Sequence, residues 1–124
     1  MKKTYADIDK FALIVKKYIS SPNHTDFKRK IELTKFNRWF QSCIEEYSNG
    51  LSAIAEKYKD YINNGVISDR EKAEEYMNER KPLMETEVEF DGELTPIPIK
   101  EMEKFKDLSP EDLSKLIDFG LVSD

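Results

Sequence analysis

An apolar stripe of about 37 residues, from Asp26 to Ile62, constrains the fold of this chain more than any other feature of its sequence. Apolar residues recur there at steps of three or four, with a mean of about 3.6, which is the period of one face of an α-helix. Because the phase is kept across Gly50, we expect one continuous helix over most of 27–62, with a kink allowed at Gly50. The stripe consists of Phe36, Phe40, Cys43, Tyr47, Leu51, Ile54, Tyr58 and Tyr61, and we expect its members from Phe40 to Tyr58 to be buried.

Such a helix is too long for a compact domain of this size. At about 1.5 Å per residue, roughly 37 residues in one helix span about 55 Å. A compact domain of 124 residues has a diameter of about 35 Å. The sequence therefore predicts either a break in the helix or an elongated molecule that buries the spare length against another chain.

A first short helix is predicted before the long one. Thr4 begins it as a cap with Asp7 three residues later, and Pro22 stops it. We expect this helix to fold back antiparallel on the first half of the long helix. Its apolar face consists of Ile8, Phe11, Ala12, Val15, Tyr18 and Ile19.

A third helix is predicted after the long one. Gly65 suits the left-handed position that ends the long helix. Ser68 and Glu71 then form a capping box for a helix at 69–80, which we expect to return antiparallel along the second half of the long helix. Pro82 is expected to end or kink it.

The period changes to two in the next segment, which is typical of a strand. Residues 86–90 alternate between polar and apolar side chains, and Asp91-Gly92 favours a two-residue hairpin turn with 93–95 as the returning strand. Pro96 and Pro98 keep the following residues extended and exclude them from the interior of a sheet.

The last helix is predicted from Ser109, an N-cap that is followed by proline and two acidic residues. The fold class that we expect is mainly α, with a long central helix, antiparallel flanking helices and a short C-terminal helix. A small β-hairpin or an extended ribbon is expected near 86–99. The chain should form a single elongated domain over 1–124, helical in 1–85 and hairpin or extended plus terminal helix in 86–124.

The charge is divided unequally along the chain, which has a net charge of −5. Residues 1–40 hold ten basic and four acidic side chains, a sum of +6, whereas the remainder holds ten basic and 21 acidic ones, a sum of −11. This division predicts contact between the two parts, within one molecule or between neighbours. The alternative interpretation is a solvated basic face that the chain's own acidic half neutralises.

Nine residues are candidates for binding a partner. The basic ones lie at the start of the long helix, where positive side chains oppose the helix dipole, so that a partner could stabilise them. Apolar candidates would supply most of the affinity, and charge would set orientation and association rate. The candidates are Lys28, Arg29, Lys30, Lys35, Arg38, Trp39, Phe90, Ile97 and Ile99.

Residues with typical catalytic or metal-binding chemistry are few. His24 is the single histidine and Cys43 the single cysteine, so neither a two-histidine metal site nor an internal disulfide is expected. We expect Cys43 to be a buried, inert thiol. No phosphate-binding glycine loop occurs, and no apolar run is long enough for a membrane helix. We therefore expect a protein that is not an enzyme and not secreted, without cofactor, metal, membrane contact or small-molecule substrate.

The order of features from Phe36 onwards, about two-thirds of the chain, resembles a group of short proteins of tailed bacteriophages. The group has a long charged helix that ends in a Lys-Tyr segment, an acidic helix, an acidic-apolar strand, a Pro-Ile-Pro extension and a terminal helix. These correspond here to Glu56-Lys57-Tyr58, 68–80, 87–90, 95–99 and 108–119. Residues 1–24 and Pro82 depart from the pattern. The resemblance implies a phage-encoded, non-enzymatic protein in the host cytoplasm or the phage particle, and it implies no functional residues.

Three hypotheses about function follow. The first is a phage structural or assembly protein that associates with a protein partner or with copies of itself. The second is a small inhibitor or adaptor that binds a host protein, with the acidic half imitating nucleic-acid charge. The third and least favoured is a nucleic-acid binder that uses the basic residues between Lys28 and Arg38.

Overall fold

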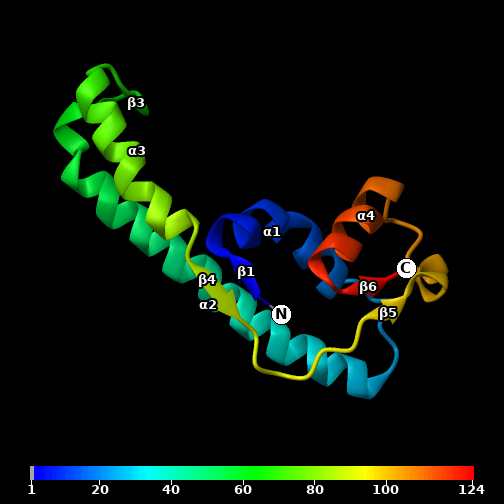
Figure 1. Cartoon of the computed structure of the whole chain (residues 1–124). Helices are drawn as coiled ribbons and strands as arrows, with labels where there is room; N and C mark the ends of the chain where they lie inside the picture. Colours follow the sequence, from blue (N-terminus) through cyan, green and yellow to red (C-terminus); the bar gives the residue numbers. More distant parts are fainter. Residues whose placement is uncertain (1) are drawn as a thin grey trace.

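The computed structural model describes residues 2–124 and consists mainly of helices (Figure 1). This confirms the predicted fold class. The helices are α1 (Tyr5–Ile19), α2 (Phe27–Lys57), α3 (Arg70–Met84) and α4 (Pro110–Phe119), with the short 3-10 helices η1 (Lys59–Tyr61) and η2 (Ile99–Lys104). The strands are β1 (Lys2–Thr4), β2 (Ile62–Asn63), β3 (Val66–Ile67), β4 (Glu87–Glu89), β5 (Ile97–Pro98) and β6 (Val122–Ser123).

Helix α2 runs without interruption through Gly50, as the phase of its apolar stripe predicted. It ends at Lys57, earlier than expected, and the prediction that Gly65 caps it is wrong. Asn64 and Gly65 have positive φ angles of 53° and 79° and form the turn of the β2–β3 hairpin. The reason is that an Asn-Gly pair readily takes the two left-handed positions of a two-residue hairpin turn.

The body of the protein forms where α1 and α4 pack on the first half of α2. Helix α1 is antiparallel to α2, because Tyr5 stacks on Tyr47 at 5.5 Å between ring centroids while Tyr18, at the other end, contacts Arg29. Phe119 of α4 lies against the rings of Phe11, Phe36 and Phe40. The buried residues of α2 are Arg29, Glu32, Leu33, Phe36, Phe40, Cys43 and Tyr47.

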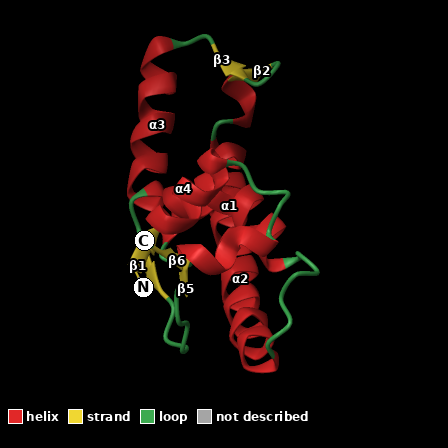
Figure 2. Ribbon diagram, turned by 90° about the vertical axis from the view of Figure 1, so that its right-hand side faces the viewer, coloured by secondary structure: helices red, strands yellow, loops and turns green. Residues whose placement is uncertain are grey.

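The second half of α2 and helix α3 form an arm, defined as residues 48–84, which projects from the body (Figures 1 and 2). Helix α3 is antiparallel to α2, because Tyr76 packs on Tyr58 and Leu83 lies beside Gly50. No residue in 48–84 is fully buried. Leu51, Ile54 and Tyr58 are therefore only partly buried, contrary to our expectation, because the helix has a single neighbour there. The molecule is elongated, as the second alternative predicted, and the spare length of α2 packs against α3 of the same chain.

The start and the end of α3 correct two predictions. Its N-cap is Asp69, whose side chain accepts the N–H of Lys72, so Ser68 and Glu71 form no capping box. Pro82 neither ends nor breaks the helix, which continues to Met84. The cost of proline is limited this close to a helix end, and Leu83 packs against the core when the helix is kept.

The segment after α3 is extended but does not form the predicted hairpin. Strand β4 pairs antiparallel with β1, and β5 pairs parallel with β6. The ring of Phe90 folds back over Gly92, where a Cβ atom would lie 2.4 Å from Cζ of that ring, and packs between Phe36 and Trp39. We call residues 85–98 the strap, because they follow α2 towards its N-terminal end (Figure 1).

Candidate protein-binding surface

Four of the five predicted basic candidates form a row on the first half of α2. This basic row consists of Lys28, Lys30, Lys35 and Arg38, all exposed. Helical spacing places Lys28, Lys35 and Arg38 within about 80° of one another around the helix, and Lys30 about 80° beyond Arg38. Within residues 2–124 none of the four side chains makes an ion pair. The interpretation in which the chain's own acidic half neutralises them through direct pairs therefore has no support in this part of the chain.

Two exposed apolar side chains lie in the basic row. Phe27 is 74% exposed and Ile31, one helical turn later, is 42% exposed. Sequence reasoning missed both residues because they lie before Phe36, the first member of the apolar stripe. The signal was their position: a phenylalanine and an isoleucine four residues apart on the charged face of a predicted helix. Large apolar groups exposed among charges are typical of an interaction surface.

Arg29 was predicted to belong to the same basic surface, and this prediction is wrong. Its side chain is buried, with 7% of the residue exposed. The guanidinium donates to the Tyr18 hydroxyl at 3.0 Å, to the Leu121 carbonyl at 3.4 Å and to the Thr95 carbonyl. It also pairs with Glu32 at 3.4 Å. Arg29 therefore joins α2 to α1, the strap and the C-terminal segment, and it has little surface left for a partner.

The four apolar candidates separate into two groups. Trp39 and Phe90 pack against each other, with ring centroids 5.5 Å apart, and are partly buried at the edge of the core. Ile97 is partly buried in β5, and Ile99, at the start of η2, is 39% exposed. Of these four residues, only Ile99 presents much of its side chain to a partner.

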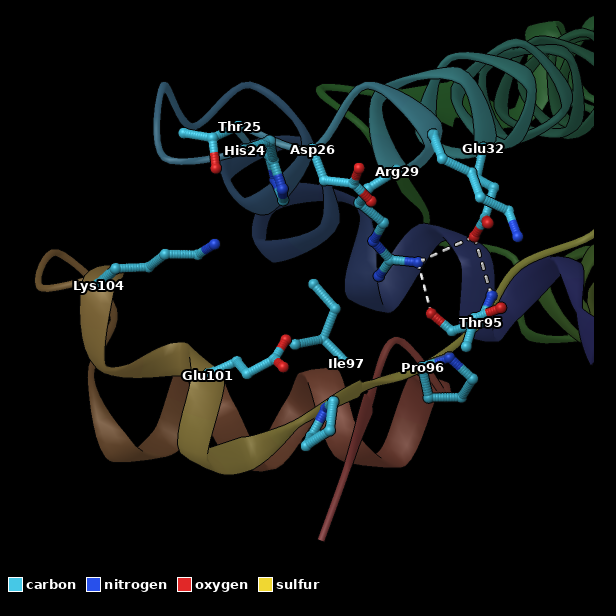
Figure 3. Close-up of a pocket in the computed structure, with 12 residues that line it drawn as sticks. His24, Thr25, Asp26, Arg29, Glu32, Thr95, Pro96, Ile97, Glu101 and Lys104 are labelled. Carbon is cyan, nitrogen blue, oxygen red and sulfur yellow. Dashed lines mark hydrogen bonds and ion pairs between the residues drawn. The ribbon is translucent and has the colours of Figure 1, made fainter.

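A cavity of about 280 Å³ lies at the N-terminal end of α2 (Figure 3). Its walls come from residues 24–32 and 95–104 and include Lys28, Glu101 and Lys104. On one side the Arg29–Glu32 pair holds Thr95, whose N–H donates to Glu32 at 3.0 Å. The charged groups of this wall are thus used in bonds that maintain the fold.

His24, at the upper wall of this cavity, has a structural position. Its Nε2 lies 2.7 Å from the Tyr18 carbonyl, and because a carbonyl oxygen only accepts, Nε2 carries the proton. The ring also packs against Tyr18 and Phe105. Burial lowers the pKa of His24, so the ring is neutral near pH 7. These contacts fix the ring within the fold.

Cys43 is a free, buried cysteine. Burial raises the pKa of the Cys43 thiol to about 11, so it stays protonated and weakly nucleophilic at neutral pH. Within residues 2–124 no group of three or more His, Cys, Asp or Glu side chains is arranged to hold a metal ion.

A second charged surface, which the sequence did not single out, lies on the strap. Five exposed carboxylates occupy alternate positions. Val88 and Phe90 between them, and Leu94 after the last of them, are partly buried against the core. None of the five makes an ion pair within the described residues. The strap brings them alongside α2. This acidic row consists of Glu85, Glu87, Glu89, Asp91 and Glu93.

Comparison of the chain with protein-family models, with curated proteins and with solved structures finds no match. In residues 2–124 no helix combines the length and the apolar character that crossing a membrane requires.

Proposed function

We propose that this chain is a non-enzymatic, phage-type structural or assembly protein that acts by protein–protein association through the basic row. The observation that carries the proposal is the exposed face of α2, where Phe27 and Ile31 stand among cations that have no ion-pair partner in residues 2–124. The order of elements from Phe36 onwards, which resembles that of short tailed-phage proteins, supports the phage assignment.

The chemistry of this face favours an acidic protein surface as the partner. Cations near the N-terminus of a helix oppose the positive end of its dipole, and carboxylates from a partner would relieve that cost. Burial of Phe27 and Ile31 would supply affinity, at about 25 cal/mol per Å² of apolar area removed from water. The charges would orient the partner and raise the association rate.

Binding of nucleic acid is less well supported by the same surface. The acidic row adjoins the basic row along α2 and would repel a phosphate backbone. Trp39, which adjoins Arg38, packs on Phe90 and Phe36 and does not offer a free face for a base. Phe27 is then the exposed aromatic ring of this surface, whereas single-stranded nucleic acid stacks its bases on several rings in succession.

A second candidate function is supported by the acidic row. Its carboxylates occupy every second position, and the two in strand β4, Glu87 and Glu89, are about 6.6 Å apart along the strand. A regular row of negative charge could occupy the nucleic-acid site of a host protein. In that case the chain would be an inhibitor or adaptor, and binding would depend on the strap rather than on α2.

The test is mass spectrometry of purified particles of the phage that encodes the chain, with three versions of the gene. We expect the parent chain in the particles and its loss from them when Lys28, Lys35 and Arg38 are all changed to Glu. The matched control changes the exposed Lys81, Lys100 and Lys106 to Glu and should be incorporated like the parent. Absence of the parent chain from particles would overturn the proposal. Capture of a host protein that depends on the acidic row would then favour the second candidate.

A further inference from the structure

We infer that the partner of the basic row is the acidic row of a second copy of this chain, in a closed two-fold dimer. The inference rests on the proposed function and deepens it by naming the partner. Four exposed cations on α2 would meet five exposed carboxylates on the strap of the other molecule. Each row repels itself and has no ion-pair partner within residues 2–124, so both gain from the contact.

The two rows adjoin along α2 and overlap only in part: Phe90, in the middle of the acidic row, packs on Trp39, so Glu85, Glu87 and Glu89 lie beside the helix on the C-terminal side of the basic row. The strap contacts α2 at two points: Phe90 packs on Trp39, and Thr95 donates to Glu32. The basic row, eleven residues on a helix, spans about 15 Å. The acidic row, nine residues with a bend at Gly92, spans at most about 26 Å. The acidic row is therefore long enough to cover the whole basic row of a neighbour.

The strap is held so that it cannot turn its carboxylates onto its own basic row. Strand β4 is fixed by its ladder with β1, in which Val88 lies opposite Lys3. Phe90 and Leu94 are anchored on the core, and because side chains alternate along an extended chain, their acidic neighbours point outward. The positive and negative side chains thus lie close in one molecule and still remain free for another.

The proximity of the basic row and the acidic row favours a second copy over an unrelated acidic protein as the partner. A uniformly acidic partner placed on the basic row would also approach the adjacent acidic row and be repelled by it. A second copy avoids this conflict. When the two-fold axis is perpendicular to α2 and passes near Trp39, the two α2 helices run antiparallel and each basic row faces the acidic row of the other molecule.

The same geometry favours a closed dimer over a filament. A head-to-tail filament needs its two complementary surfaces at different ends of the molecule. Here the two surfaces adjoin along α2, so a single isologous contact satisfies both of them. Phe27 and Ile31, which stand in the basic row, would be covered in that contact.

The experiment measures mass by sedimentation velocity and light scattering at low and at high salt. The parent chain, 14.6 kDa as a monomer, should have twice that mass at low salt and dissociate as salt rises. Changing Lys28, Lys35 and Arg38 to Glu should raise the dissociation constant about a hundredfold or more, because like charges then face each other. Changing Glu87, Asp91 and Glu93 to Lys should have the same effect.

The decisive step is to mix these two variants at equal concentration. Each should be monomeric alone, and the mixture should recover a species of twice the monomer mass, because one molecule then presents two acidic rows and the other two basic rows. The control variant with Lys81, Lys100 and Lys106 changed to Glu should dimerise like the parent, and circular dichroism should show equal helix content in all variants.

Three outcomes would overturn the dimer: a monomeric parent at low salt, a mixture of the two variants that stays monomeric, or a species that grows beyond two chains. Failure of the dimer and failure of the proposed function are distinguishable. A monomeric parent that enters particles only with an intact basic row leaves the proposed function in place. A dimer that is absent from particles leaves the dimer in place and removes the proposed function.

Discussion

The backbone N–H of Thr95 donates to Oε1 of Glu32 at 3.0 Å, and this bond holds the strap against α2. Glu32 is buried and pairs with Arg29, whose guanidinium in turn donates to the Thr95 carbonyl. One residue of the strap is therefore held through both its N–H and its C=O by a buried ion pair. The pair positions the acidic row beside the basic row, although neither of its members belongs to a row.

Replacement of Glu32 by Ala should reduce the free energy of unfolding by about 3–5 kcal/mol, because it leaves the buried Arg29 guanidinium without its carboxylate. Glu32→Gln, which keeps an acceptor for the Thr95 N–H, should lose less. Urea unfolding measures both changes. A loss below about 1 kcal/mol in the alanine variant would mean that the pair does not hold the strap.

The core of the body should be more sensitive to truncation than the arm. Phe40 is 0% exposed and lies against Phe36 and Phe119, so Phe40→Ala should cost about 3–5 kcal/mol. Leu51 is only partly buried, and Leu51→Ala should cost about 1–2 kcal/mol, near or below the lower end of the range for buried leucines. Denaturant unfolding of the two variants compares them. An equal or larger loss at Leu51 would place the main core in the arm.

The arm should open without unfolding of the body. Residues 48–84 include no fully buried side chain, whereas α1 alone holds six buried residues. Regions with few buried apolar contacts open at lower free energy than the core. Native-state hydrogen exchange should therefore show weaker protection in α3 than in α1 and the first half of α2. Equal protection throughout would show that body and arm unfold as one unit.

Acid should destabilise the protein through His24. Burial lowers its pKa in the folded state below the ordinary value of 6.5, so the unfolded chain binds a proton more readily. The free energy of unfolding keeps its full value above pH 6.5 and declines as the pH falls from 6.5 towards the lowered pKa of His24. Unfolding free energies measured across this range should decrease with acid in the parent and less in His24→Phe. The pKa of Asp112 is lowered by its bond to the Ser109 N–H, so its protonation reduces the free energy of unfolding only below about pH 3.8. That range lies below the one in which His24 titrates.

Local patterns predicted the helices well, because their signals lie within a few residues of each other. Ser109 and Asp112 form the reciprocal capping box of α4, and Gly120 ends that helix with a φ of 89°. The strand partners could not be read in this way. Strands β1, β5 and β6 have two or three residues each, and their pairing depends on where the helices place them. The alternation that marked β4 was a local signal, but its partner β1 lies more than 80 residues away in the sequence.

The burial of Arg29 could have been predicted from the sequence, but the lysines on either side of it led us to assign all three residues to one basic surface. Within the run Lys28-Arg29-Lys30, composition treats the three residues alike. Helical phase does not, because Arg29 and Glu32 lie seven and four residues before Phe36 and so on the same face. Extending the apolar stripe backwards would have placed this oppositely charged pair against the core. The acidic row, in contrast, required the position of the strap.

Gly50 allows α3 to approach α2 closely, and a double-mutant cycle tests this contact. A Cβ atom at Gly50 would lie 2.7 Å from Cδ2 of Leu83, so alanine there must displace the leucine side chain. Alanine also favours a helix interior over glycine by about 1 kcal/mol. In the parent these effects offset each other, and Gly50→Ala should change the stability of the arm little. In a Leu83→Ala background the close contact is gone, and Gly50→Ala should stabilise the arm by about 1 kcal/mol.

The opening free energy is read by hydrogen exchange at the amides of α3 in the parent, both single variants and the double variant. We expect an interaction energy above about 0.5 kcal/mol, the size that distinguishes residues in contact from independent sites. Ser52→Ala, a change at an exposed position of the same helix, should instead add to Leu83→Ala without interaction. Additive behaviour of Gly50→Ala would show that Leu83 does not lie against α2, and the position of α3 on the arm would have to be revised.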